Sequence, residues 1–270
     1  AQIESGGDQL RELVVAHDQH PQFATTAYAH ELRPHSRIPV QHHRAHIASV
    51  LAERDALDKP VIGISCDGTG YGDDGSIWGC EFFVGSVQGG FARAASLRPF
   101  LLPGGDAAAR SPVQAAAGAL SAVAGLPDLT ARPFCFPQTF IHASLLATKR
   151  IRTFSCTSAG RLFDAAAALL GFTRNVEYEG QAAEWLEQLA WRATAARPLT
   201  VHVTDAHLDA APALSELISR RIAGEDVGSI ARAFHDGFGR AIAEMALQLC
   251  ARDGIDTVVL SGGTFQNTLL

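Results

Sequence analysis

Apolar and polar residues alternate in short blocks along the first sixty positions, and these blocks predict strands and helices in turn. The apolar run at 13–16 predicts a strand, 23–31 a helix, 38–40 a second strand and 43–54 a second helix. Pro21 disfavours the helical conformation at His20 and so separates the first strand from the first helix. Strands that alternate with helices are typical of a parallel sheet, and we therefore expect an α/β fold.

The pattern then changes to β-rich runs that glycines separate, at 61–65, 77–84 and 91–101. These runs predict a strand meander. The remaining segments predict mostly helices, with one edge strand at 198–205 and one buried-type strand at 256–260. The expected helices cover residues 112–124, 137–148, 162–170, 178–195, 212–222 and 227–252.

Composition excludes several functional classes. The chain has 270 residues, of which 47% are hydrophobic and 19% charged, and its formal net charge is −6. This acidic balance, without a run of Lys and Arg, argues against a nucleic-acid-binding surface. No apolar run reaches the roughly 18–20 residues of a membrane helix, and the first residues lack the features of a signal peptide. The five cysteines are scattered and form no C-x-x-C pair, so a cytoplasmic protein is expected.

Histidines gather at the start of the chain, where seven of the eleven lie in the first 46 residues. His42 and His46 are four residues apart on a predicted helix, which places their Cβ atoms roughly 5–6 Å apart on one face. Asp67 follows the predicted strand at 61–65 and offers a hard oxygen ligand. We therefore predict a metal site of His42, His46 and Asp67. His17 and His20, together with Asp18, are candidates for proton transfer or for supporting the ligands, with purely structural roles as the alternative.

Glycines follow two of the predicted strands. Gly68, Thr69 and Gly70 predict a tight turn whose N–H groups face a phosphate, with an ordinary hairpin turn as the alternative. The acidic pair Asp73 and Asp74 beside them favours a bound cation. Near the end of the chain, Gly262 and Gly263 allow the backbone to approach a ligand without a clash from Cβ. Asn267 then lies where it could hydrogen-bond a base or ribose. His235, within a long helix, is expected to be a packed or capping histidine.

Six motifs together resemble one known family. In order along residues 17–270, they match the C-terminal carbamoyltransferase region of HypF, a family that acts in [NiFe]-hydrogenase maturation. Antibiotic O-carbamoyltransferases share this region, and tRNA threonylcarbamoyl-transfer enzymes are related more distantly. The motifs are VQHHxAH at 40–46, DGTGYGxDGxxWG at 67–79, LPGGDAA at 102–108, GRLFDA at 160–165, YEGQAA at 178–183 and LSGGxFQN at 260–267.

The resemblance implies a two-lobed ATPase fold of the actin, Hsp70 and sugar-kinase type. Residues 1–57 would belong to the N-terminal lobe with the His-x-x-x-His helix, and residues 58–270 would form the C-terminal lobe. It also implies a divalent metal, iron or zinc, on His42, His46 and Asp67, with His43 as a non-ligand neighbour. The implied nucleotide contacts are Gly68, Thr69 and Gly70 at phosphates, Asp164, Gly180 and Glu184 at the ribose, and Gly262, Gly263 and Asn267 at the adenosine.

The implied substrate is carbamoyl adenylate, which the family makes from carbamoyl phosphate and ATP, and magnesium is a further candidate cation. The implied acceptor is the C-terminal cysteine thiol of HypE, whose thiocarbamate is later dehydrated to cyanide. His17 and His20 are the candidate catalytic residues beside this metal. No nucleic-acid or membrane partner is expected.

The chain departs from the family pattern in several places. Ser111 stands where Glu is usual, Arg44 stands where a third consecutive His is common, and the family has a further metal-binding Asp downstream of position 267. The acylphosphatase, zinc-finger and adenylate-forming domains that precede this region in the family are absent from the sequence. We therefore expect a chain truncated at one or both ends.

Other functions remain open from the sequence. A small-molecule O-carbamoyltransferase and a nucleotide-binding docking module without catalysis both keep the same motifs. A sugar-kinase-like phosphotransferase would leave the histidine pair without a role. A zincin-type hydrolase is disfavoured because position 43 is His where that motif requires Glu.

Overall fold

The computed structural model describes residues 13–32, 34–193 and 196–270, and the order of its elements follows the predicted one except for the strands β7 and β9, which were not predicted. In chain order they are β1 (Val14–Asp18), α1 (Ala24–Glu31), β2 (Ser36–Val40), α2 (His42–Glu53), β3 (Val61–Tyr71), β4 (Ile77–Ser86), β5 (Gly90–Leu97), β6 (Phe100–Pro103), the 3₁₀ helix η2 (Gly105–Arg110), α3 (Pro112–Ala119), the 3₁₀ helix η3 (Leu120–Ala122), α4 (Gln138–Lys149), β7 (Thr153–Cys156), α5 (Ala159–Leu170), α6 (Gln181–Ala190), β8 (His202–Val203), β9 (His207–Asp209), α7 (Ala211–Ile222), α8 (Val227–Asp253), β10 (Val258–Ser261) and the 3₁₀ helix η4 (Gly263–Gln266).

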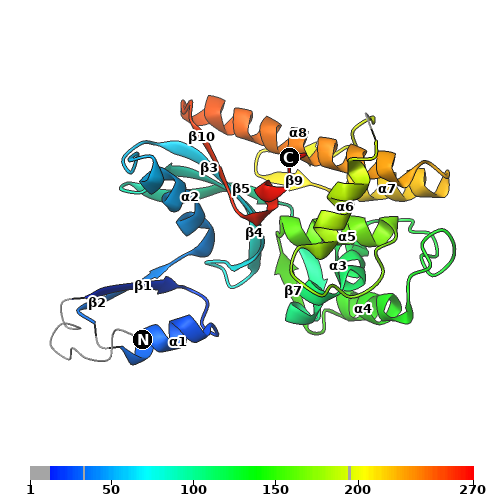
Figure 1. Cartoon of the computed structure of the whole chain (residues 1–270), viewed down its shortest axis with the longest axis horizontal. Helices are drawn as coiled ribbons and strands as arrows, with labels where there is room; N and C mark the ends of the chain where they lie inside the picture. The colour runs from blue at the N-terminus through cyan, green and yellow to red at the C-terminus, as the bar shows by residue number, and fades with distance from the viewer. Residues whose placement is uncertain (1–12, 33, 194–195) are drawn as a thin grey trace.

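The first three elements form a small unit that is set off from the rest of the chain (Figure 1). Strands β1 and β2 pair in parallel, with Ala16 opposite Ile38, and α1 connects them. This is the strand–helix–strand arrangement that the alternation of apolar blocks predicts.

The main sheet contains the predicted meander. Among the described residues its strands follow the order β10-β3-β4-β5-β9-β8, and β7 joins β4 and β6 at one end. Strands β3, β4 and β5 run antiparallel, whereas β10 pairs with β3 in parallel. The β-rich run expected at 91–101 divides into β5 and β6 around Pro99, which has no N–H to donate to a ladder.

Helices cover both faces of β3, and alternate residues of the strand show this directly. Ile62 and Ile64 pack into the large core shared with α5 and α8, whereas Val61 packs with Ile47 and Leu51 of α2 on the other face. This side-to-side alternation is the normal period of a strand. Coverage of both faces of the sheet confirms the α/β class and places α2 directly against β3, the strand that contains Asp67.

Two expectations need correction. Residues 68–70 do not form a turn but continue β3, and the hairpin turns at 73–74 instead, before Gly75 with φ of +75°. The strand expected at 256–260 is β10, but it is not fully buried: Leu260 is half exposed because β10 lies at one end of the described strand order. In both cases the decisive factor is the neighbouring strand, which local sequence does not specify.

The division into lobes at residue 57 stays a prediction, although α2, which precedes that point, packs on the sheet that follows it. Across the described ranges, no helix combines the length and apolar character that crossing a membrane requires.

Two glycines of α8 give a matched test of the packing. A Cβ at Gly237 would overlap the carbonyl oxygen of Leu199, whose N–H donates to Ala233 O (2.9 Å), whereas a Cβ at Gly239 would meet only Leu270 Cδ2 at 3.6 Å. We expect Gly237→Ala to lower the free energy of unfolding by about 1–3 kcal/mol through overpacking. Gly239→Ala should leave it unchanged or raise it by up to about 1 kcal/mol through helix propensity. Urea unfolding followed by circular dichroism measures both, and equal midpoints would contradict this packing.

Candidate metal centre

Helix α2 begins at His42 because Gln41 caps it. The Gln41 side-chain oxygen accepts the N–H of Arg44 (3.0 Å), which satisfies one of the free donors of the first turn. The amide nitrogen of Gln41 donates to the carbonyl oxygen of Tyr71 (3.1 Å) and so fixes the helix start to the β3–β4 hairpin. This cap fixes where α2 begins and so places His42 in its first turn.

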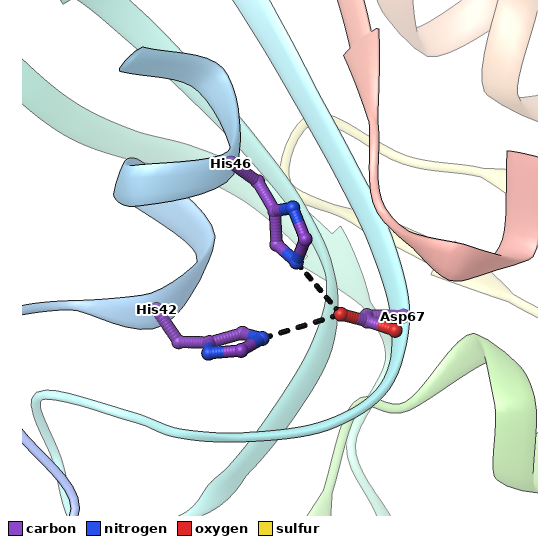
Figure 2. A group of neighbouring side chains, drawn as sticks. All are labelled: His42, His46 and Asp67. Atoms are coloured by element: carbon purple, nitrogen blue, oxygen red, sulfur yellow. Dashed lines mark hydrogen bonds and ion pairs between the residues drawn. The ribbon is translucent and has the colours of Figure 1, made fainter. Parts of the chain in front are cut away.

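The structure brings together the three predicted metal ligands (Figure 2). Asp67 Oδ2 lies 2.9 Å from His46 Nε2 and 3.3 Å from His42 Nε2. One ligand atom from each residue lies within 4.8 Å of the others, and within the described ranges no other His, Cys, Asp or Glu group meets this criterion. The three side chains are 21–31% exposed, so they are reachable from solvent but not free in it.

The Asp67 carboxylate is held in its ionised form, which favours binding of a cation. Burial alone would raise the pKa of Asp67, but hydrogen bonds from His42, His46 and the Gly68 N–H hold this pKa well below its usual range. The carboxylate is therefore ionised at neutral pH. Two imidazole nitrogens and one carboxylate oxygen directed at a common point form a donor set that iron and zinc both accept. The residues present therefore fit a divalent metal of this kind.

Asp18, at the end of β1, orients the first histidine. Its Oδ2 lies 3.0 Å from His42 Nδ1, while its Oδ1 accepts the N–H of His20 (2.7 Å). Thr26 Oγ1 donates to the Asp18 carbonyl oxygen (3.0 Å) and ties the loop to α1. A carboxylate on the far nitrogen of a ligand histidine fixes its tautomer and ring orientation. The β1 unit thus contributes directly to the candidate centre.

His43 lies inside the protein, away from the ligand group. Its Nδ1 accepts from the Gln41 amide (3.0 Å), so the ring carries its proton on Nε2. Burial lowers the pKa of His43 to about 3, and the ring is neutral. A Cβ at Gly70 would overlap this ring, so the hairpin can close over α2 only with glycine at that position.

The two acidic residues of the hairpin have protein partners. Asp73 forms an ion pair with Arg44 (2.7 Å), and Asp74 accepts the indole N–H of Trp78 (3.0 Å). Neither belongs to the ligand group described above. The structure therefore gives them a role in holding the hairpin against α2 and β4, and the cation that their charge suggested has no support from their geometry.

The Ser-Gly-Gly segment reaches the centre from the opposite side. The N–H of Gly263 lies 3.3 Å from Asp67 Oδ1, which also accepts the N–H of Gly68 (2.8 Å). Gly262 has φ of +100°, and a Cβ there would overlap the carbonyl oxygen of Cys66. In this structure Gly262 approaches the backbone of β3, at the residue next to Asp67. Contact of Gly262 and Gly263 with an adenosine stays a prediction.

Two of the predicted nucleotide contacts are already engaged within the protein. Asp164 is buried and forms an ion pair with Arg161 (3.1 Å), and burial raises its pKa to about 6. Asn267 donates through its amide nitrogen to His235 Nε2 (3.0 Å) and accepts from the N–H of Leu269 (3.0 Å). His235 is held by the Ala231 carbonyl oxygen (2.8 Å), as a packed histidine. The roles of Asp164 and Asn267 at a nucleotide stay predictions.

The other two ribose candidates lie at the start of α6. Gly180 precedes the helix with φ of +86°, and the Glu184 carboxylate accepts the hydroxyl of Tyr178 (2.8 Å). Neither contacts the group around Asp67 among the hydrogen bonds and ion pairs of the described residues. These two assignments also stay predictions.

A cavity of about 1120 Å³ opens beside the centre, and it was not predicted from the sequence. His20, Thr69 and Gly70 lie in its wall, whereas His17 does not and instead contacts the Asp18 carbonyl oxygen through Nδ1 (2.7 Å). Segments far apart in the chain supply the rest of the wall, including Phe23, Tyr71, Arg110, Arg152, Phe154, Val176 and Tyr178. Such a wall forms only when the chain folds, so no local sequence motif predicts the cavity.

Two family models match the chain in consecutive parts. Residues 8–53 match the HypF Kae1-like domain, and residues 63–270 match the second subdomain of the carbamoyltransferase Kae1-like domain. The chain is 38% identical to carbamoyltransferase HypF2 of Cupriavidus necator, an alignment that covers 97% of this chain and 36% of that protein. It is 35% identical to a carbamoyltransferase HypF homolog of the same organism, over 95% of this chain and 68% of that protein.

Solved structures give the same result. Full-length HypF in its phosphate- and nucleotide-bound form superposes with a TM-score of 0.83 at 35% identity, over 94% of this chain and 40% of that one. HypF of T. kodakarensis superposes with a TM-score of 0.82 at 31% identity, over 95% of this chain and 35% of that one. The chain thus spans little more than a third of most of these relatives. These matches confirm the resemblance drawn from the motifs, and the chain belongs to the HypF carbamoyltransferase family.

Proposed function

We propose that this chain carries the transfer of a carbamoyl group from carbamoyl adenylate to the C-terminal cysteine thiol of a HypE-like protein. In the family this step precedes the synthesis of cyanide for [NiFe]-hydrogenases. The observation that supports it most directly is the convergence of His42 Nε2 and His46 Nε2 on Asp67 Oδ2, next to a cavity lined by Thr69 and Gly70.

The reaction is an acyl transfer. The cysteine sulfur attacks the carbamoyl carbon, a C–S bond forms, the C–O bond to the phosphate breaks, and AMP leaves with that electron pair. The thiol proton passes to a base, and the acceptor becomes a thiocarbamate. A divalent metal bound by the two histidines and Asp67 would supply Lewis-acid polarisation of the carbamoyl oxygen.

The chain's own residues bind and orient the substrate. His20 accepts the N–H of Gln22 on Nδ1 (3.2 Å) and stacks on Phe23, with ring centroids 4.2 Å apart, so its ring is held at the cavity wall. Its remaining nitrogen can donate a hydrogen bond to an anionic group in the cavity. Thr69 is exposed and offers a hydroxyl on the same wall. We assign His20 and Thr69 to substrate orientation.

A cavity of about 1120 Å³ exceeds the roughly 300–1,000 Å³ of typical small-ligand sites. This volume gives room for a ligand of nucleotide size. The five cysteines form no C-x-x-C pair in the sequence, and we propose a cytoplasmic location for this chemistry.

The metal site is tested by metal content. Protein purified without oxygen should hold close to one equivalent of iron or zinc, and His42→Ala or His46→Ala should each abolish it, because two ligands remain of three. His142→Ala, an exposed histidine on α4, serves as the control and should keep its metal. Elemental analysis gives the result, and retention of metal in both ligand variants would contradict the site.

The role of Asp18 in orienting His42 is tested by measuring the affinity for the metal. We expect Asp18→Asn to weaken metal binding about 10–100-fold, since an amide no longer presents an anion to His42 Nδ1. Competition with a chromogenic chelator measures the dissociation constant. Asp128→Asn, at an exposed turn, is the matched control. An unchanged constant in the Asp18 variant would show that this carboxylate does not support the histidine.

The transfer is tested with synthetic carbamoyl adenylate and a HypE-like protein, with mass spectrometry of the acceptor. We expect carbamoylation of the C-terminal cysteine and a loss of about 10²-fold or more in rate for His42→Ala, since the Lewis acid supplies several kcal/mol of stabilisation. An acceptor with serine at its last position should not react. Nucleotide binding without transfer would favour a docking module, and reaction of small hydroxyl acceptors would favour an O-carbamoyltransferase.

A further inference from the structure

Asp67 lies where the hydrogen-bond ladder between β3 and β4 is interrupted. The regular pairing runs as far as Cys66 opposite Cys80 and resumes at Gly70 opposite Trp78. Residues 67–69 therefore face a single residue of β4, an arrangement that leaves backbone groups on both strands without their normal partners. Other groups must fix the direction of the Asp67 carboxylate.

On the β3 side, Ser158 takes this role. Its hydroxyl lies 3.2 Å from the Asp67 carbonyl oxygen and also donates to the carbonyl oxygen of Gly68. Two glycines allow this approach: a Cβ at Gly79 would lie 2.8 Å from the Asp67 carbonyl oxygen, and one at Gly160 would lie 2.9 Å from Gly68 Cα. The interrupted part of β3 therefore packs directly against the start of α5.

On the β4 side, the buried carboxylate of Glu81 replaces the missing ladder partners. Glu81 Oε1 accepts the N–H groups of Gly79 (3.2 Å) and Cys80 (3.4 Å) and the hydroxyl of Thr157. Its Oε2 pairs with Arg93 at 2.6 Å. The Glu81 side chain is fully buried, a position where a carboxylate is costly unless several donors satisfy it, as they do here.

Thr157 and Ser158 join the two sides. They are consecutive residues at the start of α5, and the Thr157 N–H also donates to the Ile77 carbonyl oxygen (2.9 Å). The Ser158 hydroxyl accepts the N–H of Arg161 (3.0 Å) and caps the helix. Hydrogen bonds therefore connect Glu81, through two neighbouring residues, to the backbone of Asp67.

We propose that Glu81, Thr157 and Ser158 are positioning residues that hold Asp67 in the orientation in which its carboxylate meets His42 and His46. The presence of a metal at this centre rests on the proposed function. The support that these three residues give to Asp67 does not. An apolar residue at position 81 would pack in a buried strand but would leave the Gly79 and Cys80 N–H groups and the Thr157 hydroxyl unsatisfied. The start of α5 would then keep the Thr157 N–H bond to Ile77 but lose its side-chain hydrogen bond to β4, and Ser158 would hold the backbone of Asp67 less firmly.

The test uses Thr157→Val, which keeps the shape of the side chain and removes the hydroxyl, and Thr157→Ser, which retains it. The first measurement is amide hydrogen exchange of the peptide at 66–71 in metal-free protein. We expect exchange to become roughly tenfold faster in Thr157→Val, as loss of a hydrogen bond to a charged group implies. The second is the metal dissociation constant, expected to rise about 10–100-fold. Thr157→Ser should restore both values.

Leu217→Ala in α7 controls for general destabilisation, because it removes a fully buried side chain of the main core. It should lower the melting temperature without accelerating amide exchange at 66–71 or raising the metal dissociation constant. Unchanged exchange in Thr157→Val, an equal change in Leu217→Ala, or failure of Thr157→Ser to restore the values would each overturn the inference. Absence of metal from the wild-type protein would contradict the proposed function. The hydrogen-exchange experiment would still test whether Glu81, Thr157 and Ser158 position Asp67.

Discussion

The candidate centre depends on a local failure of β pairing. A strand that pairs regularly along its whole length directs its backbone polar groups into the ladder, and its side chains alternate strictly between the two faces. At Asp67 the pairing of β3 with β4 is interrupted, and the carboxylate can face the two histidines of α2. The cost is a set of unpaired backbone groups, which Ser158 and Glu81 satisfy from either side. The interruption of the ladder thus coincides with the residue whose carboxylate faces both histidines.

Glycine makes this crowded region possible. Gly79, Gly160 and Gly262 each lie where a Cβ would meet the backbone of β3 near Asp67, at Asp67 itself, Gly68 and Cys66 respectively. Three chain segments therefore converge on one short stretch of strand: the neighbouring strand β4, the first turn of α5 and the Ser-Gly-Gly segment after β10. None of these glycines serves only as a flexible joint, since each allows a close contact between backbones.

The sequence predicted what depends on local spacing. His42 and His46 lie on one helical face because of their four-residue separation, and Asp67 comes directly after an apolar strand, so both could be found without knowing the fold. The contrary case is residues 68–70, whose glycines indicated a turn; the partner strand β4 instead keeps them extended. Glu81, Ser158 and the cavity could not be identified either, because their roles arise from contacts between segments distant in the chain. The family resemblance supplied Asp164 and Gly180, which no pattern of spacing had indicated.

The contact between Asp18 and His42 has a thermodynamic consequence. Asp18 belongs to the small β1–α1–β2 unit, whereas the three candidate ligands belong to α2 and β3 of the main sheet. A ligand favours whichever arrangement binds it more tightly, and the coupling is reciprocal. An ion bound at this centre would therefore favour the arrangement in which Asp18 contacts His42. That arrangement would in turn raise the affinity for the ion by the same factor. The proposed occupancy of the centre and the relative placement of the two parts would thus be a single equilibrium.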